Sequence, residues 1–282
     1  IADGANENQV RAMSDNVEEE LARAGHPLKQ REGYGTGKWI LLDFGDIIVH
    51  VFDKENRLFY DLERIWRDGI GAIDEHLNGY PRGKRNRENP YVWPASRHAW
   101  AINEVQRFFV EETRLGIPVD FTNEGLRGVE SFRATNFPTQ LGVGHTWNRE
   151  LVYRMGEIEG REARALGYTN VYAPILDVGR DQRWGRYEEV YGESPYLVAE
   201  LGIQMVRGIQ SQGVAATAKH FVGYSNGKGA REGMARNNPQ MSLREMEQVH
   251  VYPFGRVIRE AGLLGVMSSY NDFDGEPVQG SY

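Results

Sequence analysis

The chain has 282 residues, with 33 basic and 40 acidic side chains, a formal net charge of −7 and no cysteine. The negative balance argues against direct nucleic-acid binding, because phosphate binding favours a basic surface, and the lack of cysteine excludes disulfides and thiolate metal sites. No apolar run approaches the roughly 20 residues of a membrane span, so we expect no membrane partner. No export signal is visible at the start of the sequence, which favours a cytoplasmic location.

Residues 1–68 predict a small α/β domain. Residues 9–24 predict an amphipathic helix, since apolar residues recur there at three- and four-residue spacing. Two strands are expected at 39–45 and 46–52, and the Phe44-Gly45-Asp46 corner between them suits a tight hairpin. A second short amphipathic helix is expected over 56–66. Its apolar residues are Leu58, Leu62, Ile65 and Trp66.

Three stretches of this segment resemble the ribosomal silencing factor (Iojap-like) family. They are Arg31–Gly33, Trp39–Phe52 and Arg57–Trp66. The resemblance implies an α/β module that binds a large-subunit ribosomal protein and blocks subunit joining, with Glu32, Trp39 and Tyr60 at the positions that face this partner. It also implies that the first helix and strand of the family domain are missing.

From the residues alone, two of these side chains have a simpler interpretation. For Trp39 and Tyr60 the residues alone favour core packing, because aromatic side chains are usually buried, and the family resemblance reverses this preference. His50 lies between two valines of a predicted strand, which favours a core or edge histidine over one that does chemistry. No acid–base pair is visible, so residues 1–68 are interpreted as a binding module.

Residues 69–98 are predicted to be a linker or loop region, because glycines and prolines interrupt every periodic pattern. The basic run Arg82–Arg87 is interpreted as a solvated loop rather than a nucleic-acid patch, because it is short.

Residues 99–282 predict an alternation of helices and strands. Helices are expected over 99–114 and 148–166, after Ser194, and from Ser242, where Glu245 completes a capping box and Pro253 should add a kink. Strands are expected over 117–121, 170–178, 213–218 and 264–271. The alternation predicts a parallel α/β arrangement. The fold class is therefore α/β: an incomplete TIM-type (β/α)8 barrel preceded by a truncated small α/β domain.

Polar and aromatic residues follow the predicted strands, as they do at the active-site end of a barrel. They are Glu124, Arg127, Arg186, Lys219, His220, Met267 and Tyr270. A carboxylate with rigid arginine donors and nearby aromatics suits a sugar ring. Alone, Lys219 and His220 could also form a pair on a solvated loop. No phosphate-type glycine loop and no histidine pair at metal spacing occur, so we predict neither cofactor nor metal.

Four ordered stretches of this half resemble the N-terminal barrel domain of family 3 glycoside hydrolases. They are Asn123–Arg127, Arg180–Pro195, Lys219–Phe221 and Val266–Asn271. The resemblance implies retaining hydrolysis of β-linked glucosides or xylosides. It implies that Glu124 holds distal hydroxyls of the non-reducing sugar and that Arg186, Lys219 and His220 donate around the same ring. Met267 and Tyr270 match positions beside the nucleophile.

The same resemblance implies that the catalytic aspartate lies on a later strand and the acid/base on a later domain. We therefore expect no catalytic residue in this chain, and no turnover by it. Asp272 and Asp274 are interpreted as turn residues, and Glu188, Glu189 and Glu193 as a charge cluster at a helix start. Two non-enzymatic alternatives stay open: a ribosome-binding module acting through residues 1–68, and a carbohydrate-binding relic.

Overall fold

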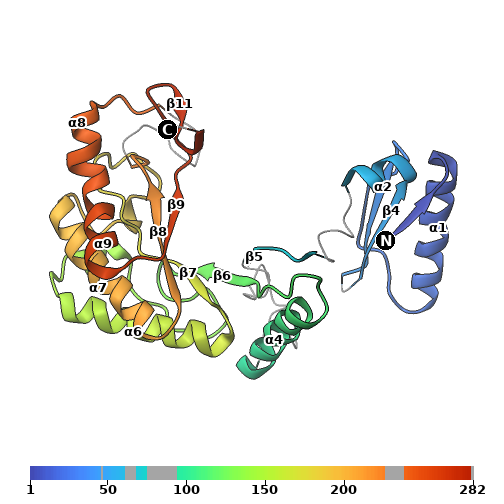
Figure 1. The fold of residues 1–282 in the computed structure, drawn as a ribbon, viewed down its shortest axis with the longest axis horizontal. Helices are drawn as coiled ribbons and strands as arrows, with labels where there is room; N and C mark the ends of the chain where they lie inside the picture. The colour runs from blue at the N-terminus through green and yellow to red at the C-terminus, as the bar shows by residue number, and fades with distance from the viewer. Residues whose placement is uncertain (46, 61–67, 75–93, 226–237, 281–282) are drawn as a thin grey trace. The chain divides into compact units, whose positions relative to one another are not determined.

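The computed structural model describes residues 1–45, 47–60, 68–74, 94–225 and 238–280. The chain forms two compact units: unit 1 comprises Ile1–Ile70 with Thr113–Leu115, and unit 2 comprises the rest from Gly71 to Tyr282. Figure 1 shows both units, which are described separately below. Within the described ranges, no helix has the length and apolar character needed to cross a bilayer.

Unit 1 contains a four-stranded sheet and two helices, α1 (Glu7–Arg23) and α2 (Lys54–Tyr60). The strands are β1 (Ala2–Gly4), β2 (Gln30–Glu32), β3 (Trp39–Asp43) and β4 (Ile48–Asp53). Their order is β1-β4-β3-β2, with β1 parallel to β4 and the other pairs antiparallel. The β3–β4 corner is a tight turn in which the Phe44 N–H donates to the Ile47 carbonyl at 2.9 Å and Gly45 has φ +99°. The predicted hairpin is therefore confirmed.

The core of unit 1 lies between α1 and one face of this sheet. Asn6 caps α1 by accepting a hydrogen bond from the Gln9 N–H at 3.0 Å. Val10 of α1 packs with Ile40, Leu42 and Val51 from the strands, and all four are 0% exposed. The predicted apolar stripe of the helix thus provides one side of this core.

The second helix of unit 1 differs from its prediction. Within α2, Leu58 and Phe59 are 81% and 78% exposed, so the expectation that Leu58 lies on a buried face is wrong. The reason is local hydrogen bonding: the Asn56 N–H donates to the Asp53 carboxylate at 2.7 Å, and Arg57 pairs with Asp3. These two polar side chains are partly buried, whereas Leu58 and Phe59 are exposed. The other predicted apolar residues of this helix, Leu62, Ile65 and Trp66, lie outside the described residues.

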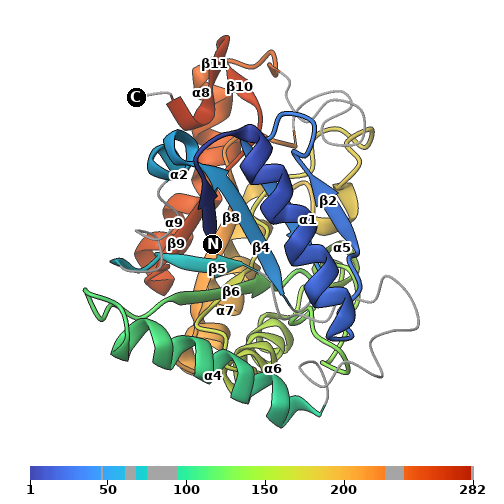
Figure 2. The ribbon, with the colours of Figure 1, turned by 90° about the vertical axis from the view of Figure 1, so that its right-hand side faces the viewer.

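Unit 2 contains a curled, five-stranded sheet in which every neighbouring pair is parallel, and it forms a half-barrel. The strands, in sheet order, are β5 (Ala72–Asp74), β6 (Asp120–Glu124), β7 (Asn170–Tyr172), β8 (Ala215–Phe221) and β9 (Gly265–Ser268). Figure 2 shows the curl, with β5 and β6 running across the view beside the upright β8. The predicted fold class, an α/β chain with barrel-type strands, is confirmed.

Helices cover the outer side of this sheet (Figure 1). They are α4 (Ala95–Glu111), α5 (Gln140–Gly144), α6 (Arg149–Leu166), α7 (Pro195–Ser211), α8 (Leu243–Glu245) and α9 (Tyr252–Ala261). Asn148 and Ser194 cap α6 and α7 with their side chains, and Gly167 ends α6 in the left-handed region at φ +101°. Glycines are favoured there because they lack a Cβ.

The predicted kink near Pro253 takes the form of a π-helix, η3 (Met246–Val251), placed directly before α9. A proline lacks the N–H that would continue the regular hydrogen-bond ladder, so the chain changes its pitch there. Beyond β9, Asp274 and Gly275 have φ of +51° and +85° between the short strands β10 (Asp272–Phe273) and β11 (Glu276–Pro277). Asp274 is therefore a turn residue, as predicted, whereas Asp272 lies on β10 and pairs with Pro277, so its interpretation as a turn residue is wrong.

Several strands of unit 2 differ from the sequence-based expectation; β6, expected over 117–121, runs from Asp120 to Glu124. The segment interpreted as a linker contains β5, which pairs with β6 through Ala72 and Asp120. A strand of three residues is too short to show a period-2 pattern, so β5 could not be predicted from the sequence. The strand expected over 170–178 is regular only to Tyr172, because Pro174 has no N–H to donate to the ladder. A single bridge between Ile175 and Lys219 follows.

Candidate functional site

A lysine–glutamate pair joins two strand ends of the half-barrel. The Lys219 ammonium on β8 lies 2.6 Å from Oε1 of Glu124 on β6. The lysine side chain is 1% exposed, whereas the glutamate side chain is 28% exposed. The ring of Tyr172 on β7 lies 5.7 Å from the lysine nitrogen. A buried cation needs a partner of opposite charge, and here that partner is also the group that reaches solvent.

The neighbouring residue on β8, His220, is fixed by partners on both ring nitrogens. Its Nδ1 lies 2.7 Å from Oδ2 of Asp177, which also accepts the His220 backbone N–H at 3.0 Å. Its Nε2 lies 2.8 Å from Nη1 of Arg186. Arginine can only donate, so Nε2 accepts and Nδ1 carries the proton. Burial lowers the pKa of His220 although Asp177 opposes the shift, which agrees with a neutral ring.

The side chain of Arg186 is buried and pairs with a carboxylate of its own. Glu189 in the 3₁₀ turn η2 (Tyr187–Glu189) accepts from the Arg186 Nε at 2.8 Å, and both residues are less than a tenth exposed. Glu189 thus lies in the short helix η2, as the charge cluster predicted, and its carboxylate also pairs with the buried Arg186 three residues earlier. Glu188 instead accepts from the partly exposed Arg127 at 2.6 Å.

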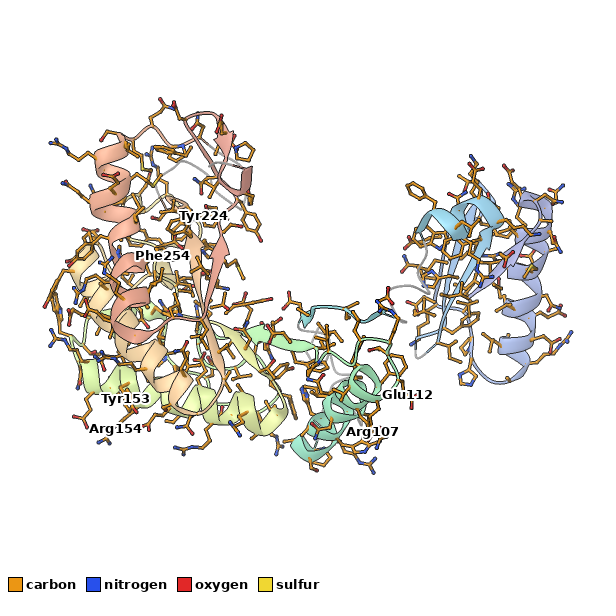
Figure 3. All side chains as sticks on the ribbon, viewed as in Figure 1. Arg107, Glu112, Tyr153, Arg154, Tyr224 and Phe254 are labelled. Atoms are coloured by element: carbon orange, nitrogen blue, oxygen red, sulfur yellow. The ribbon has the colours of Figure 1, made fainter. Side chains whose placement is uncertain are left out.

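Aromatic residues line the end of β8. Tyr224, labelled in Figure 3, lies beyond this strand, with ring centroids 5.1 Å from His220, 5.3 Å from Trp184 and 5.7 Å from Tyr270. Trp184 is 1% exposed and belongs to the core, whereas Tyr270 is 53% exposed. Tyr224 was not singled out from the sequence. Its position just after the Lys219-His220-Phe221 strand was the available signal.

The structure therefore places six of the seven predicted residues in contacts that can be named. Glu124 contacts Lys219, Arg186 contacts His220, Tyr270 reaches His220 through Tyr224, and Arg127 is linked to the turn beside Arg186. Met267 lies partly buried on β9.

Another carboxyl group, that of Glu159, lies behind this site. Glu159 on α6 is 0% exposed, and its carboxyl oxygens have no hydrogen-bond partner among the described residues. It packs against the backbone of Gly125, where an added Cβ would lie 2.2 Å from Oε1. Burial raises the pKa of Glu159 well above its usual value, and the nearby Glu124 adds to this shift.

In unit 1 the predicted partner-facing residues differ in exposure. Glu32 on β2 is exposed and accepts from the Gln30 amide at 2.6 Å. Trp39 is half-buried: its ring stacks on Phe52 with centroids 5.1 Å apart, and its Nε1 donates to Nδ1 of His50 at 3.1 Å. His50 is thus a hydrogen-bonded strand residue with a pKa lowered by burial. The side chain of Tyr60 lies outside the described part.

Within the described ranges, no three histidine or acidic side chains are grouped so that they could hold a metal ion. The arrangement in unit 2 is instead a set of fixed donors and acceptors at the carboxyl ends of barrel strands, which is where barrel enzymes bind substrates. Lys219 and Glu124, which now bind each other, can instead form hydrogen bonds with hydroxyl groups of a ligand. Neutral His220 holds Arg186 and Asp177 through its two ring nitrogens.

Fold and site together define a barrel-type enzyme domain with a polar strand-end site. Residues 93–282 match the family model of the glycosyl hydrolase family 3 N-terminal domain. The match covers most of the chain, and the chain belongs to this family. Residues 1–98 match the family model named ribosomal silencing factor during starvation. Both resemblances seen in the sequence are confirmed.

The relatives of this chain include proteins named β-xylosidase and proteins named β-glucosidase. A β-xylosidase of Formosa agariphila is 41% identical over 178 residues, which are 58% of this chain and 24% of that protein. A β-glucosidase of Rhizobium radiobacter is 35% identical over 169 residues, or 57% of this chain and 20% of that protein. The chain thus spans about a quarter or less of the length of these relatives.

Solved structures agree with this relationship. A β-glucosidase from Erythrobacter marinus superposes with a TM-score of 0.68 and 28% identity, covering 80% of this chain and 29% of that one. A β-glucosidase from Listeria innocua in complex with isofagomine gives 0.58 and 35%, covering 64% of this chain and 25% of the other.

Proposed function

We propose that unit 2 forms the sugar-binding part of a retaining glycosidase that acts on β-linked glucosides or xylosides. The observation that carries this proposal is the Lys219–Glu124 pair, in which a buried ammonium holds a solvent-reaching carboxylate at the strand ends. Such a pair offers one fixed donor and one acceptor to adjacent hydroxyls of a sugar ring. The β-xylosidase and β-glucosidase relatives support the substrate class.

The other side chains have supporting roles in this proposal. Arg186 and neutral His220 would donate and orient around the same ring, with Asp177 fixing the histidine tautomer. Tyr270 and Met267 would line its edge, and Arg127 would act from the loop after β6. The hydrolytic chemistry itself requires two carboxyl groups in defined roles. We assign neither role to a residue of this chain.

Hydrogen exchange tests this proposal on the full chain. Addition of glucose or xylose should slow amide exchange in the segments 124–128 and 219–225, because bound sugar would order both strand ends. Mannitol, which is an open-chain polyol, serves as the control ligand. Equal exchange with and without sugar up to molar concentrations would refute a sugar site at these strands.

We propose a second function for unit 1, namely binding of a large-subunit ribosomal protein. The match of residues 1–98 to the silencing-factor model supports it, as do exposed Glu32 and half-buried Trp39 on adjacent strands. The chain should sediment with large ribosomal subunits, and Glu32→Arg should weaken this association. Glu19→Arg on α1 is the matched surface control. Unchanged sedimentation of the Glu32 variant would remove this residue from the interface.

A further inference from the structure

A hollow of about 540 Å³ lies between the first turns of α6 and α7 and shares no residue with the strand-end site. Its lining combines exposed aromatic rings with paired charges. The lining includes Trp147, Arg149, Glu150, Tyr196 and Glu200. A pocket of this size suits a small molecule or a few linked sugar rings, and a concave surface is a poor match for a flat protein interface.

Two aromatic side chains form its walls. Trp147 is 68% exposed and has φ +54°, a left-handed conformation that is rare for a bulky residue. Tyr196 is 51% exposed, and the guanidinium of Arg256 lies 5.9 Å from its ring centre. Its hydroxyl lies 3.4 Å from Arg149. Tyr196 is thus held by two arginines, while much of its surface stays open to solvent.

The charged side chains of the hollow are paired with groups of opposite sign. Glu200 is 16% exposed and accepts from Arg149 and from Arg256, each at 2.9 Å. Glu150 pairs with Arg154 at 2.6 Å. Each cation has an acidic partner, so the hollow offers donors and acceptors without a strong net field. This chemistry disfavours an anion or a cation and favours a neutral polar ligand.

We propose that this hollow is a second carbohydrate site, which binds an internal segment of a β-linked glucan or xylan. Sugar rings present weakly positive C–H groups on one face, and these pack against the negative face of an indole or phenol ring. Their hydroxyls would meet Glu200 and Arg149. The choice of ligand rests on the proposed function, since a chain that carries a glycoside site encounters polymers of the same sugars.

Affinity electrophoresis of the full chain in gels containing soluble xylan or β-glucan tests the proposal. We expect retardation of the wild-type chain by at least one polymer. Trp147→Ala and Tyr196→Ala should each weaken binding about tenfold. Trp100→Ala is the matched control, because Trp100 on α4 is 50% exposed and lies elsewhere in unit 2. Circular dichroism melting of each variant checks that it is folded.

The outcomes separate this proposal from the proposed function. If the two aromatic variants bind like wild type, or neither polymer retards the chain, the second site is refuted. If Lys219→Met alone abolishes retardation, the polymer binds at the strand ends, which refutes the second site and supports the proposed function. If retardation requires Trp147 while sugars leave the strand ends unprotected in hydrogen exchange, the second site stands and the proposed function fails.

Discussion

At the scale of single residues, the site depends on which groups are charged. The Lys219 nitrogen lies beside the Glu124 carboxylate, and burial lowers the pKa of His220, whose Nε2 accepts from Arg186. A protonated His220 would place a second cation against Arg186 in a buried site, which is costly. The histidine therefore acts as a fixed acceptor and donor rather than as a source of charge.

A buried histidine away from the site provides a test of pH dependence. His98 on α4 is 0% exposed, packs against Tyr168 with ring centroids 5.4 Å apart, and has no nitrogen hydrogen-bonded among the described residues. Burial lowers the pKa of His98 from 6.5 to about 4. The unfolded chain therefore takes up a proton first as the pH falls below 6.5, and the stability of the native state declines between these two values.

Replacing this histidine should flatten that decline. At pH 5 the wild-type chain should have lost about 2 kcal/mol of stability through this group. Between pH 7.5 and 5, the His98→Phe variant should lose about 2 kcal/mol less stability than the wild-type chain. The reason is that phenylalanine keeps the ring contact but cannot titrate. Urea unfolding at both pH values measures the difference. A parallel loss in both proteins would show that His98 is not buried in its neutral form.

The sequence predicted the strand-end residues Lys219, His220 and Glu124, but it did not predict which other residues contact them. The pattern of Lys219-His220 after small residues was visible, and so was Glu124 after a strand. Glu189 and Tyr224 could not be assigned, because their roles depend on a three-residue turn and on a ring contact between distant segments. Such contacts arise from tertiary structure and leave no periodic signal.

At the scale of elements, α6 and α7 approach each other closely through glycines. A Cβ on Gly208 would lie 2.3 Å from the carbonyl oxygen of Tyr153, and one on Gly156 would lie 2.6 Å from that of Met205. Figure 3 labels Tyr153 on α6. These contacts are with backbone atoms, which cannot move aside as a side chain can.

Alanine substitution at these glycines should therefore separate the helices. We expect Gly208→Ala to lower the free energy of unfolding by about 1–3 kcal/mol through overpacking. Gly255→Ala on α9 is the control: its Cβ would meet only the flexible end of Arg259 at 3.3 Å. There, alanine should be neutral or stabilising by up to about 1 kcal/mol. Equal effects of the two variants in urea unfolding would contradict the close helix contact.

Helices were predicted more accurately than strands. Ser194 caps α7 as the sequence predicted, and the helix expected over 148–166 is α6, with Asn148 as its N-cap and Gly167 as its C-cap. The strand β5 has three residues and is defined by its partner β6, so no local pattern reveals it. Leu58 was misplaced for a related reason, since hydrogen bonds of Asn56 and Arg57 decide which side of α2 faces the sheet.

At the scale of the whole molecule, each of the two units has its own buried residues. Ile40, Leu42 and Val51 belong to the core of unit 1, whereas Ile175, Trp184 and Tyr224 form a cluster in unit 2. Units with separate cores are expected to unfold separately. The sequence resemblances to two families predicted such a division, with the first segment ending at residue 68, and the first unit ends its main stretch at Ile70.

A core substitution in one unit tests this independence. Leu42 is 0% exposed, so Leu42→Ala should cost unit 1 about 2–5 kcal/mol. Hydrogen exchange followed by mass spectrometry should show faster exchange in peptides of unit 1 and unchanged exchange in peptides of unit 2. Faster exchange throughout both units would mean that the chain unfolds as one cooperative body.

The central claim is that Lys219 and Glu124 bind a sugar ring at the strand ends of unit 2. The most direct measurement is calorimetric titration of the full chain with isofagomine, a ligand seen in the Listeria innocua relative. Lys219→Met should weaken binding at least about a hundredfold, since a charge-assisted contact is worth roughly 1.5–3 kcal/mol and Glu124 also loses its partner. Arg107→Met, at a surface ion pair with Glu104, should bind like wild type. Equal affinity of the Lys219 variant and the wild type would contradict the account.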